Sequence, residues 1–315
     1  MTPDISIVIP VYNTGSYLPA TIASLKALDG GCTYEFICVD DGSTDDSLSL
    51  LRRWADEDSR VHVFTQPNQG QSVARNEAFR HVSGEWIYCL DSDDILTHDA
   101  LTSAHAEATR LGAEMLLFSG TIIDESGEMI DEVEGTVFHN QRYIRPEALP
   151  TDRLLDGEEV MSVLLDNFIF RAVPWLYIVR TDFLRATGIT FQPGIIHEDE
   201  HFTAALTLSC RRMAVLHRTL VLHRIRTSST MGARFSRRNM ECYLCVIDGM
   251  NEWMRRNPEH RHMAWRYCAY TLNHVLITAR SLPLRDRWWT LRRIVRSGYL
   301  PYIEPKRLMQ FIYGR

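Results

Sequence analysis

The sequence predicts an α/β protein with a mostly parallel sheet flanked by helices and with a helical extension at its C-terminal end. Over the first 120 residues, short apolar runs alternate with stretches whose apolar residues recur at helical spacing. This alternation is typical of βαβ units, which build parallel sheets covered by helices on both faces. From about residue 236 onward the pattern is helical. The chain of 315 residues is long enough to bury a large core without disulfides or a structural metal.

The expected elements follow one another in regular order. The expected strands are the apolar runs Ile5–Val11, Phe36–Val39, Val61–Phe64, Trp86–Leu90 and Met115–Phe118. The expected helices are Tyr17–Leu28, Ser47–Trp54, Ser72–His81 and Ala100–Leu111. In sheets of this kind ligands bind beyond the carboxyl ends of the strands, so we expect the functional residues there.

Charge is distributed unevenly along the chain. Residues 1–134 carry 24 acidic side chains against 7 Lys and Arg, whereas residues 135–315 carry 16 against 27. An acidic half joined to an arginine-rich half indicates different partners for the two parts. Neither half has the strongly basic composition of a dedicated nucleic-acid module, so no nucleic-acid partner is expected. The hydrophobic content of 45% excludes a disordered chain.

The cysteines and the N-terminal residues indicate a cytoplasmic protein. Seven cysteines at irregular spacing favour reduced thiols. The chain begins without a basic segment followed by an apolar one, so no signal peptide is expected. No run reaches the length of about 18 apolar residues that would predict a membrane-spanning helix.

Two of the expected strands end in clusters of carboxylates. Asp40 and Asp41 follow one strand, and Asp91, Asp93 and Asp94 follow another. If the strand pleat continues, Asp91 and Asp93 point to the same side of the sheet. Paired carboxylate oxygens are the ligands that Mg²⁺ and Mn²⁺ prefer. The sequence therefore predicts a divalent-metal site at this edge.

Arg75 is an unusual residue for the first turns of a helix. A cation there opposes the helix field unless an anion lies beside it, and a nucleotide diphosphate or a neighbouring aspartate would be that anion. The glycine-containing loop before this helix offers backbone N–H groups to an anion. Neither G-x-G-x-x-G nor a P-loop is present, which argues against the dehydrogenase and P-loop classes.

Four stretches across residues 5–95 together resemble one family. They are Ile9-Pro10-Val11-Tyr12-Asn13, Val39 to Asp45, Asn68 to Asn76, and Leu90-Asp91-Ser92-Asp93-Asp94. In this order they are similar to the family 2 glycosyltransferases of the Rossmann-like GT-A fold, in particular to bacterial enzymes of surface or capsular polysaccharide synthesis. Leu222 to Ser229 resembles the closing loop of this family. Arg226 stands where other members carry a metal-binding histidine, so that ligand is not assigned here.

The resemblance implies a role for each matched residue. The donor nucleotide site would contain Pro10, Val11, Tyr12, Asn13, Asp40, Asp41, Arg75, Asp91, Ser92, Arg224 and Arg226. Asp93, together with Asp91, would hold Mn²⁺ or Mg²⁺. Asp199 would be the catalytic base, with Glu198 as the second candidate. Trp175 would stack on an acceptor sugar, although a core aromatic is an equally reasonable interpretation.

The reaction that the resemblance implies is inverting and divalent-metal-dependent. A nucleotide-sugar donor, usually UDP-linked, would transfer its sugar by single displacement to a hydroxyl of a glycan or lipid-linked acceptor. Two alternatives stay open. A sugar nucleotidyltransferase would carry a glycine-rich basic loop after the first strand, which Val11 to Gly15 lacks. A non-catalytic nucleotide-binding scaffold would be expected to lose the carboxylates.

The resemblance and the pattern divide the chain in two. Residues 1–232 would form the catalytic domain, with a nucleotide-binding half of about 1–120 and an acceptor half of about 121–232, and residues 233–315 a helical extension. Residues 285–315 interleave arginines with aromatic residues, which is typical of a helix lying on an anionic membrane surface. We therefore expect peripheral attachment to the inner face of a membrane, with packing on the catalytic domain or a homodimer as the alternative.

Overall fold

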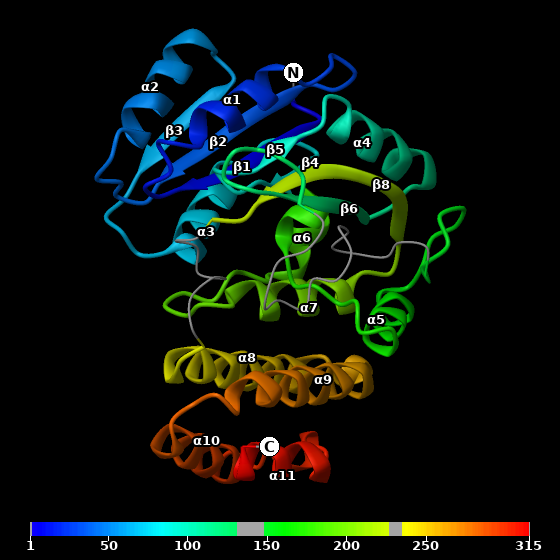
Figure 1. Ribbon diagram of the computed structural model, residues 1–315. Helices are drawn as coiled ribbons and strands as arrows, with labels where there is room; N and C mark the ends of the chain where they lie inside the picture. Colours follow the sequence, from blue (N-terminus) through cyan, green and yellow to red (C-terminus); the bar gives the residue numbers. More distant parts are fainter. Residues whose placement is uncertain (1, 131–147, 227–234, 315) are drawn as a thin grey trace.

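The computed structural model describes residues 2–130, 148–226 and 235–314, and Figure 1 shows their layers. In this part of the chain, eight strands form one sheet in the spatial order β3–β2–β1–β4–β7–β6–β8–β5. The strands are β1 (Ile5–Val11), β2 (Tyr34–Asp40), β3 (Val61–Thr65), β4 (Trp86–Cys89), β5 (Ile95–Leu96), β6 (Met115–Ile123), β7 (Tyr177–Arg180) and β8 (Met213–Arg224). The predicted α/β class is confirmed.

The helices cover the sheet and continue beyond it to the C-terminal end. The α-helices are α1 (Leu18–Lys26), α2 (Ser47–Glu57), α3 (Gln71–His81), α4 (Ala100–Leu111), α5 (Gly157–Asp166), α6 (Thr181–Thr187), α7 (Glu198–Ser209), α8 (Arg237–Arg256), α9 (Arg261–Ala279), α10 (Leu284–Arg296) and α11 (Pro305–Tyr313). Short 3₁₀ turns include η2 (Pro174–Leu176).

The N-terminal half of the sheet is parallel, as predicted. β1 pairs in parallel with β2 and β4, and β2 pairs in parallel with β3. Every residue of β1 and β2 is buried, as expected for strands that helices cover on both faces. The apolar runs predicted as strands correspond to β1, β2, β3, β4 and β6, and the helical stretches to α1 through α4.

Beyond β4 the sheet is mixed, and this reversal matters for the site. β7 lies between β4 and β6 and runs antiparallel to both. The start of β7, and η2 just before it, therefore lie at the carboxyl edge of β4. The hydroxyl of Tyr88 in β4 donates a hydrogen bond of 3.0 Å to the carbonyl of Trp175 in η2. A segment from the middle of the chain is thus fixed at the edge where Asp91 emerges.

The C-terminal helices are layered beneath α7, with α8 and α9 next to it and α10 and α11 at the far end (Figure 1). The hydroxyl of Tyr267 in α9 donates to the Glu200 carboxylate at 2.6 Å. The ring of Tyr243 in α8 stacks on His197 with 4.2 Å between centroids. The layer therefore supports the first turn of α7. The domain boundary near residue 232 stays a prediction, since residues 227–234 lie outside the described part.

The outermost helices carry apolar side chains on their surface. Leu284 and Trp288 of α10 are 62% and 59% exposed, and Tyr313 of α11 is 66% exposed. On its inner side α10 is fastened to α8, because Arg293 forms an ion pair of 2.5 Å with Asp248. None of the described helices combines the length and apolar character needed to cross a membrane.

Candidate active site

One cavity of about 540 Å³ opens at the carboxyl edge of the sheet and gathers most of the predicted residues. Its wall is drawn from segments far apart in the sequence, because the ends of β1 and β4, the start of α3, η2, the start of α7 and the end of β8 all meet there. The predicted residues in the wall are Pro10, Val11, Tyr12, Asp41, Arg75, Asp91, Ser92, Asp93, Trp175, Glu198, Asp199, Arg224 and Arg226.

Two predicted donor residues lie outside this wall. Asn13, with a left-handed φ of 50°, accepts a hydrogen bond of 2.7 Å from the backbone N–H of Thr44. Asp40 is 2% exposed, and its carboxylate accepts weakly from the N–H of Ser43. Both residues therefore bind the loop after β2, and the structure does not bring either side chain to the cavity.

The Asp41 carboxylate is occupied by the loop before α3. It accepts from the N–H of Gln69 at 2.9 Å and from that of Gly70 at 2.8 Å. The loops approach closely, since a Cβ on Gly42 would lie 2.8 Å from the backbone N of Asn68. The N–H of Gly70, which we expected to be open to an anion, is thus used internally. Asp41 shapes the cavity wall by holding this loop.

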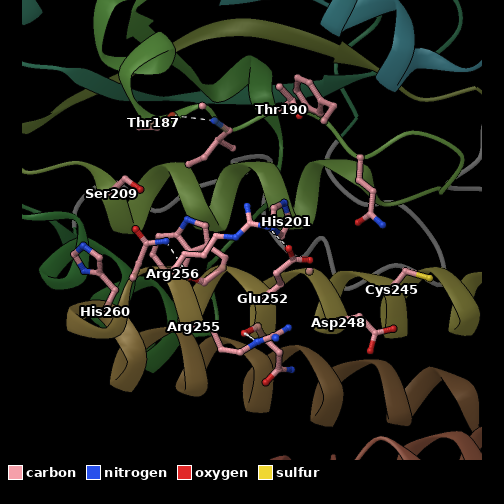
Figure 2. A pocket seen from close by; sticks show the side chains of 18 of the residues that line it. Thr187, Thr190, His201, Ser209, Cys245, Asp248, Glu252, Arg255, Arg256 and His260 are labelled. Carbon is pink, nitrogen blue, oxygen red and sulfur yellow. Dashed lines mark hydrogen bonds and ion pairs between the residues drawn. The ribbon is translucent and has the colours of Figure 1, made fainter.

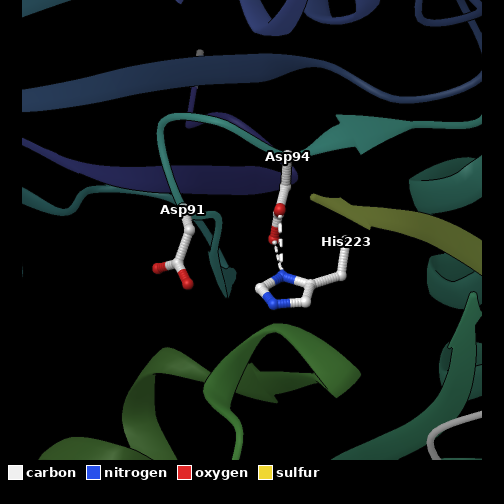
Figure 3. Close-up of side chains that lie close together, drawn as sticks. All are labelled: Asp91, Asp94 and His223. Carbon is white, nitrogen blue, oxygen red and sulfur yellow. Dashed lines mark hydrogen bonds and ion pairs between the residues drawn. The ribbon is translucent and has the colours of Figure 1, made fainter. Parts of the chain in front are cut away.

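Residues 91–94 form a turn rather than a continuation of β4. The N–H of Asp94 donates to the carbonyl of Asp91 at 3.1 Å, so the pleat that we expected to align Asp91 with Asp93 is absent. Asp91 and Asp94 instead converge with His223, with one ligand-type atom of each lying within 4.8 Å of the others (Figure 3).

Asp94 and His223 form a buried ion pair. His223 Nδ1 donates to the Asp94 carboxylate at 2.9 Å, and the backbone N–H of Arg224 donates to it at 2.9 Å. Burial disfavours the imidazolium, but the facing carboxylates, Asp94 above all, outweigh this and raise the pKa of His223 to about 9. A protonated ring facing Asp94 is a poor metal ligand, because its nitrogens carry protons.

Trp175 packs against His223 and does not present an open ring face to a ligand. The indole is 2% exposed and stacks on His223 with 4.8 Å between centroids. A Cβ on Gly120 would lie 2.8 Å from the indole, so the glycine leaves room for this packing. The expectation that Trp175 stacks on an acceptor sugar is therefore not supported, and the core interpretation of this aromatic fits the structure.

Arg75 joins the two halves of the site. Its guanidinium contacts Asp91 at 2.7 Å and Glu198 at 2.9 Å, and it lies 5.1 Å from the ring centroid of Phe191. The anion required by a cation in the first turns of α3 is therefore supplied by carboxylates, as one of the two sequence interpretations proposed. Arg75 is 2% exposed, which makes it a buried link between β4, α3 and α7.

The acidic first turn of α7 contains one carboxylate that is tied down and one that faces the cavity. Glu198 is 1% exposed and is paired with Arg75, which stabilises its charged form and makes it a weaker base. Asp199 also lines the cavity. Burial, followed by the charges of Glu198 and Glu200, raises the pKa of Asp199 well above its usual value. A raised carboxyl pKa beside a cavity is suited to accepting a proton.

The two arginines that end β8 are held differently. Arg224 donates through its guanidinium to the backbone carbonyls of Asp93, Asp124 and Glu125, at 2.9 to 3.0 Å. Arg226 Nε lies 2.8 Å from the Asp93 carboxylate. Both guanidinium groups lie about 5.5 Å from the ring centroid of Tyr17. Arg224 is therefore fixed by backbone, whereas Arg226 faces a carboxylate.

The carboxylates fit a divalent ion in part. Asp91 and Asp93 offer hard oxygen donors to the cavity, with side chains 28% and 9% exposed. Burial raises the pKa of Asp93 to about 7, with further contributions from Asp94 and Asp91. This indicates that the carboxylate charge is incompletely compensated where it stands. Carboxylate oxygens of this kind are donors that Mg²⁺ and Mn²⁺ prefer, although Arg226 lies against Asp93 in this structure.

A second, larger cavity of about 1030 Å³ lies on the other side of α7, between α6, α7 and α8 (Figure 2). It contains none of the predicted site residues. Several of its charges are already paired, such as Arg256 with Glu252 and His260 with Glu158. The predicted site residues therefore gather in the smaller cavity, which also contains the carboxyls of Asp93 and Asp199 with raised pKa values.

His223 is the main site residue that sequence reasoning missed. No spacing in the sequence links this residue to Asp94. The available signal was the carboxylate cluster itself, because three neighbouring acids at a sheet edge require nearby cations. The closing-loop residues 227–229 lie outside the described part of the chain.

Known proteins share both the sequence pattern and the fold. Residues 6–153 match the Glycosyl transferase family 2 profile. Glycosyltransferase GlyG of Streptococcus pneumoniae is 26% identical over 243 residues, a match that spans 75% of each chain. The chain spans less than two thirds of the length of several other curated glycosyltransferases that it matches, with shares of 22% to 63%.

Solved structures agree on the architecture. S. aureus TarS 1–349 in complex with UDP has a TM-score of 0.62 at 17% identity, covering 99% of this chain and 92% of that one. The same TarS fragment has also been solved with UDP-GlcNAc. Mannosyltransferase PcManGT from Pyrobaculum calidifontis, in complex with GDP-Man and Mn²⁺, has a TM-score of 0.53 at 15% identity, covering 100% of this chain and 85% of that one. The family match over residues 6–153, the curated relatives and the common architecture support a family 2 glycosyltransferase of the GT-A fold.

Proposed function

We propose that the protein is an inverting glycosyltransferase that moves a sugar from a UDP-linked donor to a hydroxyl of a glycan or lipid-linked acceptor. The observation that carries this proposal is the single cavity in which Tyr12 and Asp91 lie in the same wall as Asp199. The family assignment favours this reaction over a sugar nucleotidyltransferase or a scaffold. TarS, which has the same fold, has been solved with UDP and with UDP-GlcNAc.

The donor nucleotide would bind at the end of β1. Pro10 and Val11 end this strand in the cavity wall, and Tyr12 beside them is 47% exposed. An exposed aromatic ring at a cavity rim provides a face on which a nucleobase stacks. Asp91 and Ser92, at the end of β4, would lie toward the ribose or the donor sugar. Arg224 would add a fixed positive charge near the diphosphate.

Asp199 would act as the general base of a single displacement. The acceptor hydroxyl attacks the anomeric carbon from the face opposite the leaving group, and its proton passes to the Asp199 carboxylate. The bond from the anomeric carbon to the diphosphate oxygen breaks, and its electron pair leaves with the nucleoside diphosphate. Attack from the opposite face inverts the configuration. Glu198 and Arg75 would hold the first turn of α7 in position for this step.

Asp93 and Asp91 are the residues that would hold a divalent ion, Mn²⁺ or Mg²⁺. When bound, such an ion supplies positive charge to the leaving diphosphate. PcManGT, with the same fold, has been solved with Mn²⁺.

We further propose that the protein is cytoplasmic and attaches peripherally to a membrane through α10 and α11. The exposed apolar residues Leu284, Trp288 and Val295 recur at helical spacing along α10. Arg285, Arg292 and Arg296 are exposed on the adjoining face of that helix. This arrangement suits an anionic lipid surface and would place the cavity near a lipid-linked acceptor. A homodimer through the same helices is the competing explanation.

The proposal is tested by incubating the protein with a panel of UDP-sugars, Mn²⁺ and candidate acceptors while measuring UDP release. We expect release from at least one donor, and NMR of the product is expected to show an inverted anomeric centre. Asp199→Asn is expected to slow release by about 10²–10⁴-fold without weakening UDP binding. Absence of both UDP binding and UDP release across the panel would contradict the proposal.

A further inference from the structure

Each carboxylate in the turn after β4 already faces a cation of this chain. Asp91 contacts Arg75 at 2.7 Å, and Asp94 contacts His223 at 2.9 Å. Asp93 contacts Arg226 at 2.8 Å. Arg75 is also held by Glu198, and His223 is packed against Trp175. The Arg226 guanidinium has a second contact as well, because it lies 5.4 Å from the ring centroid of Tyr17.

Arg226 differs from the other two cations in how it meets its carboxylate. Its Nε is buried and, among the described residues, has no hydrogen-bond partner, although it lies close to the Asp93 carboxylate. The contact is thus one of charge without a directed hydrogen bond. The Arg226 side chain is 24% exposed. Arg224, by contrast, donates to several backbone carbonyls.

We propose that Arg226 is a resident cation that competes with the divalent ion for Asp93, and that a bound nucleotide diphosphate relieves this competition by offering the guanidinium a new anion. The part of this inference that concerns the nucleotide diphosphate rests on the proposed function, whereas the competition between Arg226 and the metal does not. Its consequence is an order of events. In the absence of nucleotide Arg226 lies against the Asp93 carboxylate and metal binding is weak, whereas with nucleotide bound the metal binds tightly.

The physical basis is charge repulsion at short range. A guanidinium and a dication on one carboxylate repel each other. This repulsion lowers the affinity of the site for the metal as long as the guanidinium stays beside the carboxylate. A diphosphate accepts a guanidinium through two parallel hydrogen bonds, which is a better partner than the undirected contact described above. The exposed side of Arg226 in the cavity wall gives the side chain a route to such a ligand.

The test measures Mn²⁺ binding by electron paramagnetic resonance at pH 8 without nucleotide. Arg226→Gln is expected to bind Mn²⁺ at least about tenfold more tightly than the unmodified protein, because one repelling charge is removed. Arg226→Lys, which keeps the charge, is expected to stay near the unmodified value. Arg60→Gln removes an arginine from a surface ion pair with Asp58 and serves as a matched control without effect. Asp93→Asn is expected to lose Mn²⁺ binding.

A second titration adds UDP. We expect UDP to tighten Mn²⁺ binding by the unmodified protein more than by Arg226→Gln, since that variant has no competition to relieve. Thermal melts of all variants establish that they are folded.

The inference is overturned if Arg226→Gln binds Mn²⁺ no more tightly than the unmodified protein, or if neither binds it. It is also overturned if UDP tightens binding equally in both. These readouts need no sugar transfer. A gain in Mn²⁺ affinity with no turnover on any UDP-sugar would therefore remove the proposed function and keep the competition. Turnover of a UDP-sugar without a gain in Mn²⁺ affinity would remove the competition and keep the proposed function.

Discussion

Arg75 Nη1 lies 2.9 Å from Glu198 Oε1, and this ion pair joins α3 to the first turn of α7 with side chains only 3% and 1% exposed. The same guanidinium reaches Asp91 after β4. The turn after β4 and the start of α7 are thus connected by one buried residue. Its removal should affect both the fold and the chemistry.

Arg75→Met is expected to destabilise the protein by about 3–5 kcal/mol, because it leaves Glu198 and Asp91 without their buried partner. Chemical denaturation measures this loss. The double variant Arg75→Met/Glu198→Gln is expected to recover part of it, since one of the uncompensated charges is gone. Arg60→Met, which breaks the exposed pair with Asp58, should cost at most about 1 kcal/mol. Equal losses in the two single variants would contradict the buried link.

Asp199→Asn is expected to lower kcat by about 10²–10⁴-fold, because the amide cannot accept the acceptor proton. KM for the donor should change little, since the residue lies on the acceptor side. Glu198→Gln serves as the comparison. If Glu198 acted as the base instead, its substitution would produce the larger loss in kcat and Asp199→Asn would retain most of its turnover.

The pH profile should reflect the raised pKa of Asp199. The base must be ionised to act, so kcat/KM rises with pH through a limb that lies above the range of an ordinary aspartate. A limb near pH 4 would disagree with this assignment. The profile is measured with substrate far below KM, so that it reports the free enzyme.

The same raised pKa has the opposite effect on stability. The folded protein retains a proton on Asp199 at a pH where the unfolded chain has released it. The stability contributed by this carboxyl therefore falls as pH rises above its unfolded value. The experiment is chemical denaturation of both proteins at pH 5 and at pH 8. The free energy of unfolding of Asp199→Asn, relative to that of the unmodified protein, should be higher at pH 8 than at pH 5. Asp182, whose pKa is lowered by Arg180, is the control of opposite sign.

Tyr12→Ala is expected to raise KM for the UDP-sugar by about tenfold and to leave kcat largely unchanged, because base stacking contributes about 1–3 kcal/mol per ring. Tyr12→Phe should retain most of the affinity, since it keeps the ring. UDP titration by calorimetry gives the binding change independently of turnover. If Tyr12→Ala lowered only kcat and left the affinity for UDP unchanged, the nucleobase would not stack on Tyr12.

Leu284→Ser/Trp288→Ser is expected to weaken binding to anionic vesicles while leaving the melting temperature nearly unchanged, because both residues are exposed on α10. Co-sedimentation with vesicles of anionic and of neutral lipid measures the effect. Trp265→Ser, on α9 and 42% exposed, is the matched control. Unchanged sedimentation of the double variant, together with a smaller oligomer in solution, would favour the homodimer.

The sequence was informative wherever structure depends on neighbours along the chain. Apolar periodicity located the strands and helices of the first 120 residues, and the carboxylates after β4 marked the site. The sequence was less informative about which side chains contact one another in the folded protein. Whether Asp41 binds a ligand or a loop depends on how residues 66–70 fold back, and whether Trp175 faces a sugar depends on His223 and Gly120. Such pairings arise from tertiary packing, which a local pattern does not encode.

The distinction between Glu198 and Asp199 illustrates the same limit of local patterns. The two residues are adjacent in an acidic turn, and the sequence ranked them without an argument of geometry. Only the position of α3 relative to α7 pairs Glu198 with Arg75, while both carboxylates line the cavity. One helical step of 100° thus separates a structural carboxylate from a candidate base.

The hydrogen bond from Tyr267 to Glu200 connects the last third of the chain to the acidic turn of α7. For protein engineering, this means that residues 233–315 cannot be exchanged between relatives as an independent module. A chimera that takes these helices from a relative must also take the matching α7, because otherwise the foreign helix would leave Glu200 buried without its hydroxyl donor. In evolution, α7 and α9 are accordingly expected to change together.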